Sequence, residues 1–269
     1  NLLSTESGLK YFVLSALSSG LVRYGCSLIY GFSGSTNFNE ISISISNVQY
    51  GLTFGIVFIL VGLAFKISAV PFHMWAPDVY EGSPTSVTIF FAILPKIAAL
   101  TVFIRFLYVP FLNLIDQWQM ILVFLSIASM LFGAVAAIGQ KNLKRLIAYS
   151  SISHIGYALA GLATGSNYGI QSSVIYMTIY IIMNLGFFSC LLMMKRNNIY
   201  YEQIDDLSGL SKNHPLLSLS LLIILFSLAG IPPLAGFFAK FYIFKSVIEQ
   251  SMYFLAIVGL LSTVVAAFY

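Results

Sequence analysis

Three lysines lie inside long apolar stretches of this sequence, and they are the residues best suited to chemistry. Lys66 lies within the stretch 51–80, Lys96 within the apolar run 90–107, and Lys240 within the stretch 216–248. An ammonium group held in hydrocarbon costs at least ~2.5 kcal/mol, so three of them indicate a function. Burial disfavours the charged form, whereas a carboxylate or water favours it, so such a lysine is poised to bind and release a proton. The alternative is that each lysine reaches the lipid head groups along its helix.

A second polar group surrounds His154. Ser150, Ser151 and Tyr157 stand four, three and three residues from His154, which predicts that all four share one face of a helix. Hydroxyl groups beside an imidazole can hold water and relay a proton near neutral pH. The alternative is a set of hydrogen bonds between helices that only packs a bundle.

Two apolar stretches contain prolines where a helix should break. Pro71 interrupts the first, and Pro232 with Pro233 interrupts the second. Irregular backbone inside a membrane is tolerated where it is buried in protein or lines a wet cavity, and paired breaks are typical of transporters built from inverted repeats. Ordinary proline kinks are the alternative. His73, two residues past Pro71, is either a second proton-binding group or a partner for carbonyls freed at the break.

The composition places these residues in a membrane protein. Hydrophobic residues make up 59% of the chain and charged residues only 8%, too few for the surface of a soluble domain. Apolar runs of about 20 residues predict an all-α, polytopic membrane helix bundle. We expect eight spans, at residues 9–31, 51–80, 84–108, 119–138, 143–164, 170–194, 216–248 and 252–269.

Other classes of function find little support. The net charge of +4 lies mainly in loops that include Lys10, Lys144 and Arg145, and the positive-inside rule explains it without nucleic acid. Cys26 and Cys190 are too far apart for a metal pair, and the sequence shows no phosphate-binding loop or serine triad. We therefore expect no metal, no cofactor bound by this chain and no nucleic-acid partner.

Four motifs give the sequence a family resemblance. Together they resemble subunit 2, the antiporter-like membrane subunit, of proton-pumping NADH:ubiquinone oxidoreductase (respiratory complex I), and the mitochondrially encoded form is the most similar. The motifs are FKISAVPFHMWAPDVYEGSPT at 65–85, LPKI at 94–97, KRLIAYSSISH at 144–154 and AGIPPLAGFFAKF at 229–241.

The resemblance implies a role for each candidate residue. Lys66 corresponds to the broken-helix lysine of a first half-channel, Lys96 to a connecting lysine, His154 to a central histidine and Lys240 to the broken-helix lysine of a second half-channel. The family also has a membrane glutamate that pairs with the first lysine. That glutamate has no counterpart here, because Glu6 lies before the first predicted span, so another chain or segment would supply it.

The resemblance also implies an organisation and a setting. Residues 1–138 would hold the end of one antiporter-like half and the start of the second, and residues 139–269 the remainder, in a partial or split chain. The partners would be other membrane-arm subunits, a chain or segment with the missing N-terminal helices, and lipids. NADH, FMN, iron–sulfur clusters and ubiquinone would be bound by partner subunits. The location would be the mitochondrial inner membrane, with bacterial or plastid energy-transducing membranes as alternatives.

The predicted function is proton translocation by a non-redox subunit of NADH:ubiquinone reductase, along Lys66, Lys96, His154 and Lys240. Two alternatives stay open. A subunit of a multisubunit cation/proton antiporter would share the broken helices and the lysines. A scaffold without transport would bridge neighbouring subunits and leave the lysines unused.

Overall fold

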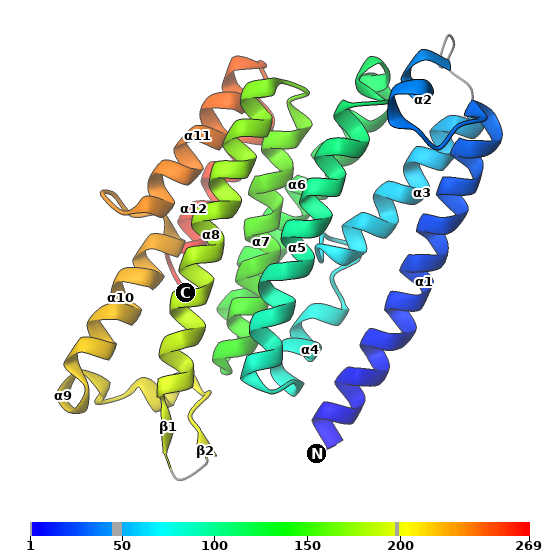
Figure 1. The fold of residues 1–269 in the computed structure, drawn as a ribbon. Coiled ribbons are helices and arrows are strands. Elements are labelled where there is room, and N and C mark those ends of the chain that lie inside the picture. The colour runs from blue at the N-terminus through cyan, green and yellow to red at the C-terminus, as the bar shows by residue number, and fades with distance from the viewer. Residues whose placement is uncertain (1, 45–49, 197–198) are drawn as a thin grey trace.

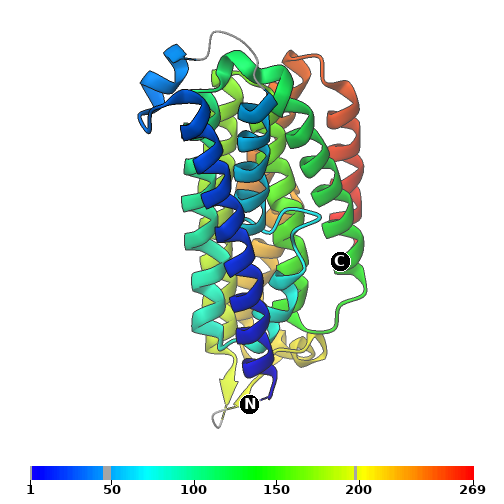
Figure 2. The same cartoon turned by 90° about the vertical axis from the view of Figure 1, so that its right-hand side faces the viewer.

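The computed structural model describes residues 2–44, 50–196 and 199–269, and long helices dominate it. The helices run side by side in one bundle (Figures 1 and 2). In chain order they are α1 (Leu2–Ser33), α2 (Phe38–Ser44), α3 (Tyr50–Lys66), α4 (Trp75–Gly82), α5 (Thr85–Tyr108), α6 (Ile115–Ile138), α7 (Leu143–Ala163), α8 (Asn167–Met193), α9 (Leu210–Asn213), α10 (Pro215–Ala229), α11 (Ala235–Glu249) and α12 (Tyr253–Ala266).

Short elements connect these helices. Two 3₁₀ turns, Leu112–Leu114 and Ile204–Leu207, precede α6 and α9, and the two-residue strands β1 (Lys195–Arg196) and β2 (Ile199–Tyr200) pair antiparallel after α8. The hairpin is the one departure from the all-α prediction among the described residues. The sequence reading did not include α2, α9 or the hairpin, because their residues are too few or too polar to stand out beside the spans.

The predicted spans are confirmed as helices. Five helices are long and apolar enough to cross a membrane by length and composition: α1, α5, α6 with its preceding turn, α7 and α8. In Figure 1, α3 continues through a break into α4, and α10 through a break into α11, so each pair makes one crossing. The start of the first span was wrong, because the helix begins at Leu2 rather than at residue 9 and therefore includes Glu6.

The first break follows Lys66, about midway along the bundle (Figure 1). Pro71 has no amide hydrogen to donate, and side chains satisfy other backbone groups around it. The amide of Val70 donates to the Ser129 hydroxyl on α6 at 2.9 Å, and the Trp75 indole donates to the Phe65 carbonyl at 2.9 Å. These bonds hold the irregular backbone against α6, although Pro71 and Met74 are exposed on the described chain.

The second break separates α10 from α11 around Pro232 and Pro233, also about midway along the bundle (Figure 1). The Gly236 amide donates to the Ser227 hydroxyl at 3.1 Å, across the break. A β-carbon at Gly236 would overlap the Ser227 carbonyl, so only glycine allows the two half-helices to approach this closely.

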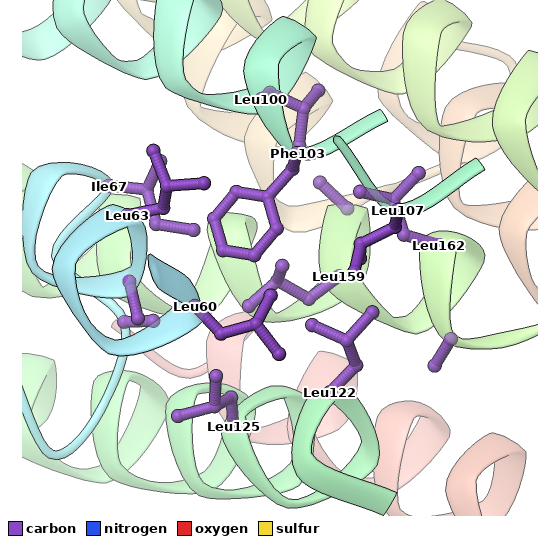
Figure 3. Packing of buried hydrophobic residues seen from close by; sticks show 14 of the residues in the cluster. Leu60, Leu63, Ile67, Leu100, Phe103, Leu107, Leu122, Leu125, Leu159 and Leu162 are labelled. Carbon is purple, nitrogen blue, oxygen red and sulfur yellow. The ribbon is translucent and has the colours of Figure 1, made fainter. Parts of the chain in front are cut away.

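The bundle is packed around α7. Of 18 consecutive apolar-segment residues of α7, 94% are buried in the bundle, whereas the corresponding share for α1 is 17%. Leu159 on α7 packs in a cluster with Leu60 and Leu63 of α3, Phe103 of α5 and Leu122 of α6 (Figure 3). Because lipid is as apolar as these side chains, close packing rather than escape from water stabilises such a cluster. α7 is therefore the element against which groups from several helices converge.

Charged residues tie three helices together at one end of the bundle. Lys10 on α1 pairs with Asp78 on α4 at 2.7 Å, and Arg145 on α7 pairs with Asp78 at 3.1 Å and with Glu81 at 2.8 Å. The N-terminus, the turn before α7 and the β hairpin all lie at this end (Figure 1). Positive side chains thus gather on one face, as the positive-inside pattern predicts.

Candidate functional site

Lys96 is the most deeply buried of the three lysines, with an exposed fraction of 0%. Its ammonium donates to the Ser151 hydroxyl on α7 at 2.7 Å. The rings of Tyr80 on α4 and Tyr180 on α8 lie 5.5 and 6.0 Å from its Nζ, within range of a cation–π contact. The Ser151 hydroxyl in turn donates to the Ala148 carbonyl of its own helix. Lys96 therefore reaches the bundle interior and not the lipid head groups.

His154 lies one helical turn beyond Ser151 on α7 and is 4% exposed. Its Nδ1 is 2.5 Å from the Tyr176 hydroxyl, and its ring centroid is 5.2 Å from that of Tyr180 and 6.3 Å from that of Tyr157. An imidazole in hydrogen-bond contact with a phenol can accept or give up a proton through that contact.

Lys240 is 4% exposed and lies on α11, past the second break. Its ammonium donates to the Ala229 carbonyl, the last residue of α10, at 2.9 Å, and lies 5.0 Å from the centroid of the Tyr157 ring. The C-terminal end of a helix carries partial negative charge, so α10 ends where it stabilises this cation. Gly230 makes the approach possible, because a β-carbon there would lie 3.2 Å from the Lys240 Nζ.

Lys66 is placed differently from the other two lysines. It is partly exposed, and its ammonium donates to the Ser15 hydroxyl on α1 at 2.6 Å. No hydrogen bond, ion pair or ring contact of the described residues joins it to Lys96. Glu6 is nine residues from Ser15, about 13 Å along a helix axis, and it pairs with Lys10 instead. The described chain thus brings no carboxylate to Lys66.

The predicted stripe beside His154 is divided among three environments. Ser151 binds Lys96, whereas Ser150 lines a cavity of about 230 Å³ with Tyr269 and residues around the second break. Tyr157 turns toward α12, where its hydroxyl is 2.7 Å from the Ser262 hydroxyl. Ser150 and His154 are four residues apart on the unbroken helix α7, so the predicted shared face stays a prediction, but their neighbours differ. Successive residues of a helix point about 100° apart, so Ser151 meets Lys96 of α5 whereas Ser150 meets the cavity lined by Tyr269.

His73 lies apart from the three lysines. Its ring packs against Phe132 of α6 with 4.4 Å between centroids, and its Nδ1 makes no hydrogen bond within the described residues. No contact recorded for the described chain joins it to Lys66 or Lys96. Its role as a second proton-binding group stays a prediction.

Three tyrosines of the site were missed by the sequence reading. Tyr80, Tyr176 and Tyr180 are all at most 2% exposed and surround Lys96 and His154. Tyr176 and Tyr180 are four residues apart on α8, so their spacing predicts a shared helix face. That spacing could have been noticed in the sequence. With 16 tyrosines in the chain, however, two tyrosines four residues apart do not by themselves indicate a functional pair.

The arrangement joins titratable groups by hydroxyls and aromatic rings from Lys96 through His154 to Lys240. Such a line can bind protons and pass them over short distances at mid-depth of the bundle. Among the residues that the structure describes, no group of three histidine, cysteine or acidic side chains lies close enough together to hold a metal ion.

Comparisons with known proteins agree on one family. A model of the NADH:quinone oxidoreductase/Mrp antiporter transmembrane family matches residues 1–266. The chain is 84% identical over 266 residues to NADH-quinone oxidoreductase subunit N of Pelagibacter ubique, with 99% of this chain and 56% of the relative covered. It is 56% identical over 271 residues to the subunit of the same name from Parvibaculum lavamentivorans, with 100% and 56% covered. The chain thus spans little more than half the length of these relatives.

Solved structures share the fold. A chain of respiratory complex I from Thermus thermophilus with bound aureothin superposes with a TM-score of 0.86 and 34% identity, covering 100% of this chain and 58% of that one. A chain of the Mrp complex from Dietzia sp. superposes with a TM-score of 0.91 and 25% identity, covering 99% and 49%.

Proposed function

Because this chain belongs to the NADH:quinone oxidoreductase/Mrp antiporter transmembrane family, we propose that it forms part of the proton-translocating membrane arm of an NADH:quinone oxidoreductase. The subunit moves protons across the membrane without taking part in the redox chemistry. Its similarity to subunit N relatives supports this assignment.

One observation carries the proposal: three titratable side chains lie close together inside the bundle, where carrying a charge is unfavourable in free energy for each of them. Lys96 and Lys240 are buried, and His154 stands within electrostatic range of both. At an effective dielectric constant of ~20, two unit charges about 8 Å apart interact by roughly 2 kcal/mol. A change of charge on one group therefore alters the proton affinity of the next. A chain that only needed to pack would hold apolar residues at these positions.

The proposed path runs from Lys66 to Lys96, His154 and Lys240. Lys66, at the first break, would exchange protons with a carboxylate supplied by another chain or segment, since the family pairs this position with a glutamate. Ser151 and Tyr157 support the path by their contacts with Lys96 and Lys240. His73 is proposed to support proton transfer beside the first break, at Pro71. Ser150 is proposed to do so beside the second break, at Pro232 and Pro233.

The remainder of the complex supplies what this chain lacks. NADH, FMN, iron–sulfur clusters and ubiquinone would bind to partner subunits, and other membrane-arm subunits and lipids would cover the outer faces of the bundle. We propose that residues 1–138 contain the end of one antiporter-like half and the start of the next, and that 139–269 continue the second.

Two membranes are candidates for the location of the complex: the mitochondrial inner membrane and a bacterial energy-transducing membrane. The motifs resemble the mitochondrially encoded subunit, so the mitochondrial inner membrane stays a prediction. The relatives compared above are bacterial proteins, and their identity of up to 84% favours the bacterial energy-transducing membrane.

A cation/proton antiporter subunit is the second candidate function. The TM-score of 0.91 with a chain of the Mrp complex supports it, since the fold alone serves both kinds of complex. Copurification separates the two candidates, because only the first predicts that the chain is isolated with redox subunits.

Replacing Lys96 with Met tests conduction against a scaffold role. Met has a similar length and no charge, so the bundle should fold and the complex should assemble. We expect NADH-driven proton pumping in vesicles that contain the assembled complex to fall severely. Lys245→Met is the matched control, because Lys245 is on α11 with a half-exposed side chain that pairs weakly with Glu249 at 3.9 Å. Undiminished pumping by the Lys96→Met complex would refute proton conduction along this path.

A further inference from the structure

Two buried phenols beside Lys96 have no hydrogen bond of normal geometry, although polar side chains lie near both of them: Ser151 near Tyr80, and Ser151 and Asn184 near Tyr180. The hydroxyls of Tyr80 and Tyr180 make no hydrogen bond of normal geometry within the described chain, although their residues are 0% and 1% exposed. Leaving a buried hydroxyl unpaired is unfavourable, and phenylalanine would fill the same space without that penalty. The other phenols of the site are paired: Tyr157 with Ser262, and Tyr176 with His154.

Both unpaired phenols face the same polar group. Each is near enough to the Ser151 side chain for a weak hydrogen bond, and Ser151 already accepts a hydrogen bond from Lys96. Tyr180 has Asn184 of its own helix as a second polar neighbour. Three groups from α4, α5 and α8 therefore converge on one hydroxyl of α7. A donor that is not committed to a fixed partner can change partners as the charge beside it changes.

Only one of the two phenols also reaches His154. The Tyr180 ring centroid is 5.2 Å from the His154 ring, and Tyr180 is 6.0 Å from the Lys96 Nζ. The Tyr80 ring is close to Lys96, but no ring contact or hydrogen bond of the described residues links it to His154. Tyr180 is thus the side chain that bridges the two titratable groups.

We propose that Tyr180 relays protons between Lys96 and His154, an inference that rests on the proton-translocating function proposed above. The Ser151 hydroxyl, which donates to the Ala148 carbonyl in this structure, first turns toward Tyr180. The Lys96 ammonium then gives a proton to the Ser151 oxygen while the Ser151 proton moves to the Tyr180 oxygen. The adjacent Tyr180 and His154 rings then shift so that the Tyr180 hydroxyl passes its proton to Nε2 of His154, the ring nitrogen that does not contact Tyr176. Lys96 ends as a neutral amine and His154 as an imidazolium, and both hydroxyls keep one hydrogen each.

Tyr180→Phe tests the relay in the assembled complex. The substitution keeps the ring and its contact with the Lys96 cation but removes the hydroxyl. We expect NADH-driven pumping to fall severalfold, with assembly unchanged. Tyr80→Phe is the matched control, because it removes the other unpaired hydroxyl beside Lys96 without touching the bridge to His154. Its effect should be clearly smaller.

A second readout separates a relay from a structural role. Difluorotyrosine at position 180 restores a hydroxyl that is more acidic, so pumping should recover with an altered pH dependence. The titratable groups facing position 180 are Lys96 from α5, His154 from α7, Tyr80 from α4 and Tyr176 from its own helix, and they are unchanged in this variant. A merely structural hydroxyl would give recovery with the original pH profile.

The outcomes distinguish this inference from the function on which it rests. Full pumping by Tyr180→Phe, together with loss of pumping by Lys96→Met, overturns the relay and leaves the function standing. Equal losses for Tyr180→Phe and Tyr80→Phe also overturn it, because general polarity around Lys96 would then explain the effect. Full pumping by Lys96→Met contradicts the function itself.

Discussion

The two helix breaks look alike in sequence but hold their lysines in different ways. Lys240 is 4% exposed, and its ammonium contacts the carbonyl end of α10 and the face of Tyr157. Lys66 is partly exposed, and its ammonium contacts one hydroxyl, that of Ser15, and lies 6.0 Å from the Tyr11 ring. The second break thus surrounds its cation with stabilising groups from the chain itself, and the first does not.

The difference shows what a buried cation needs. A half-helix end supplies partial negative charge, and an aromatic face adds a cation–π contact, so Lys240 can hold a proton without a carboxylate. Lys66 has a neutral hydroxyl in place of the helix end and a more distant ring, that of Tyr11 at 6.0 Å, and it stays closer to the surface of the bundle. We infer that Lys66 depends on a counter-charge from outside the described chain, whereas Lys240 does not.

Removing Lys240, the lysine with more stabilising contacts, should have the largest effect on proton pumping. We expect Lys240→Met to lower proton pumping roughly tenfold or more, which corresponds to about 1.4 kcal/mol on the barrier. The thermal midpoint of the assembled complex should hold or rise, because replacing a buried charge by an apolar side chain is often neutral or stabilising. Pumping assays and a thermal melt check both. A large drop in the midpoint with intact pumping would mean that Lys240 is structural.

A smaller effect is expected from the glycine that admits Lys240 to the end of α10. Gly230 has a φ of +91°, so Gly230→Ala should cost about 1–2 kcal/mol in backbone strain, and its β-carbon would also push the ammonium away. Gly209→Ala is the matched control, since its φ is +76° and a β-carbon would meet nothing within 4 Å. Denaturation should register a similar loss in both, and pumping should fall in Gly230→Ala alone. If the Gly230→Ala and Gly209→Ala complexes pumped protons equally well, the proposed contact between the end of α10 and Lys240 would have no role in pumping.

The smallest effect is expected at the first break. Ser15→Ala removes the hydroxyl that accepts from Lys66, and because that lysine is partly exposed, the loss should be below about 1 kcal/mol. Pumping should fall by no more than roughly twofold, a change equivalent to less than half a kcal/mol on the barrier. Ser19→Ala is the control, because its hydroxyl bonds to the Ser15 carbonyl of the same helix. If Ser15→Ala matched the loss in Lys240→Met, the proposed dependence of Lys66 on an external charge would be wrong.

Much of the fold could be predicted from the sequence because local rules decide it. Runs of about 20 apolar residues define helices such as α5 and α8 whatever their neighbours are, and Pro71 and Pro232 break helices by their own geometry. The early start of α1 was missed because the charges of Glu6 and Lys10 resemble a loop. In the structure both lie in α1, where Lys10 pairs with Glu6 and with Asp78, 68 residues away in the sequence.

The site could be predicted in part. A lysine in an apolar run is conspicuous, so Lys96 and Lys240 were found without knowing the fold. Which hydroxyls face them depends on how helices pack, and Ser150 and Ser151 point into different spaces although they are adjacent. The spacing of Tyr176 and Tyr180 predicts a shared helix face, but it does not distinguish Tyr180 from a tyrosine that only packs. Only its position between Lys96 and His154 does so.

The number of protons pumped per electron by the Lys96→Met complex tests the central claim most directly. It is measured in proteoliposomes at an electron flux matched to that of the unmodified complex, with Lys245→Met as the reference. The account predicts a lower ratio for Lys96→Met and an unchanged ratio for Lys245→Met. An unchanged ratio for Lys96→Met in a fully assembled complex would contradict a proton path through Lys96, His154 and Lys240.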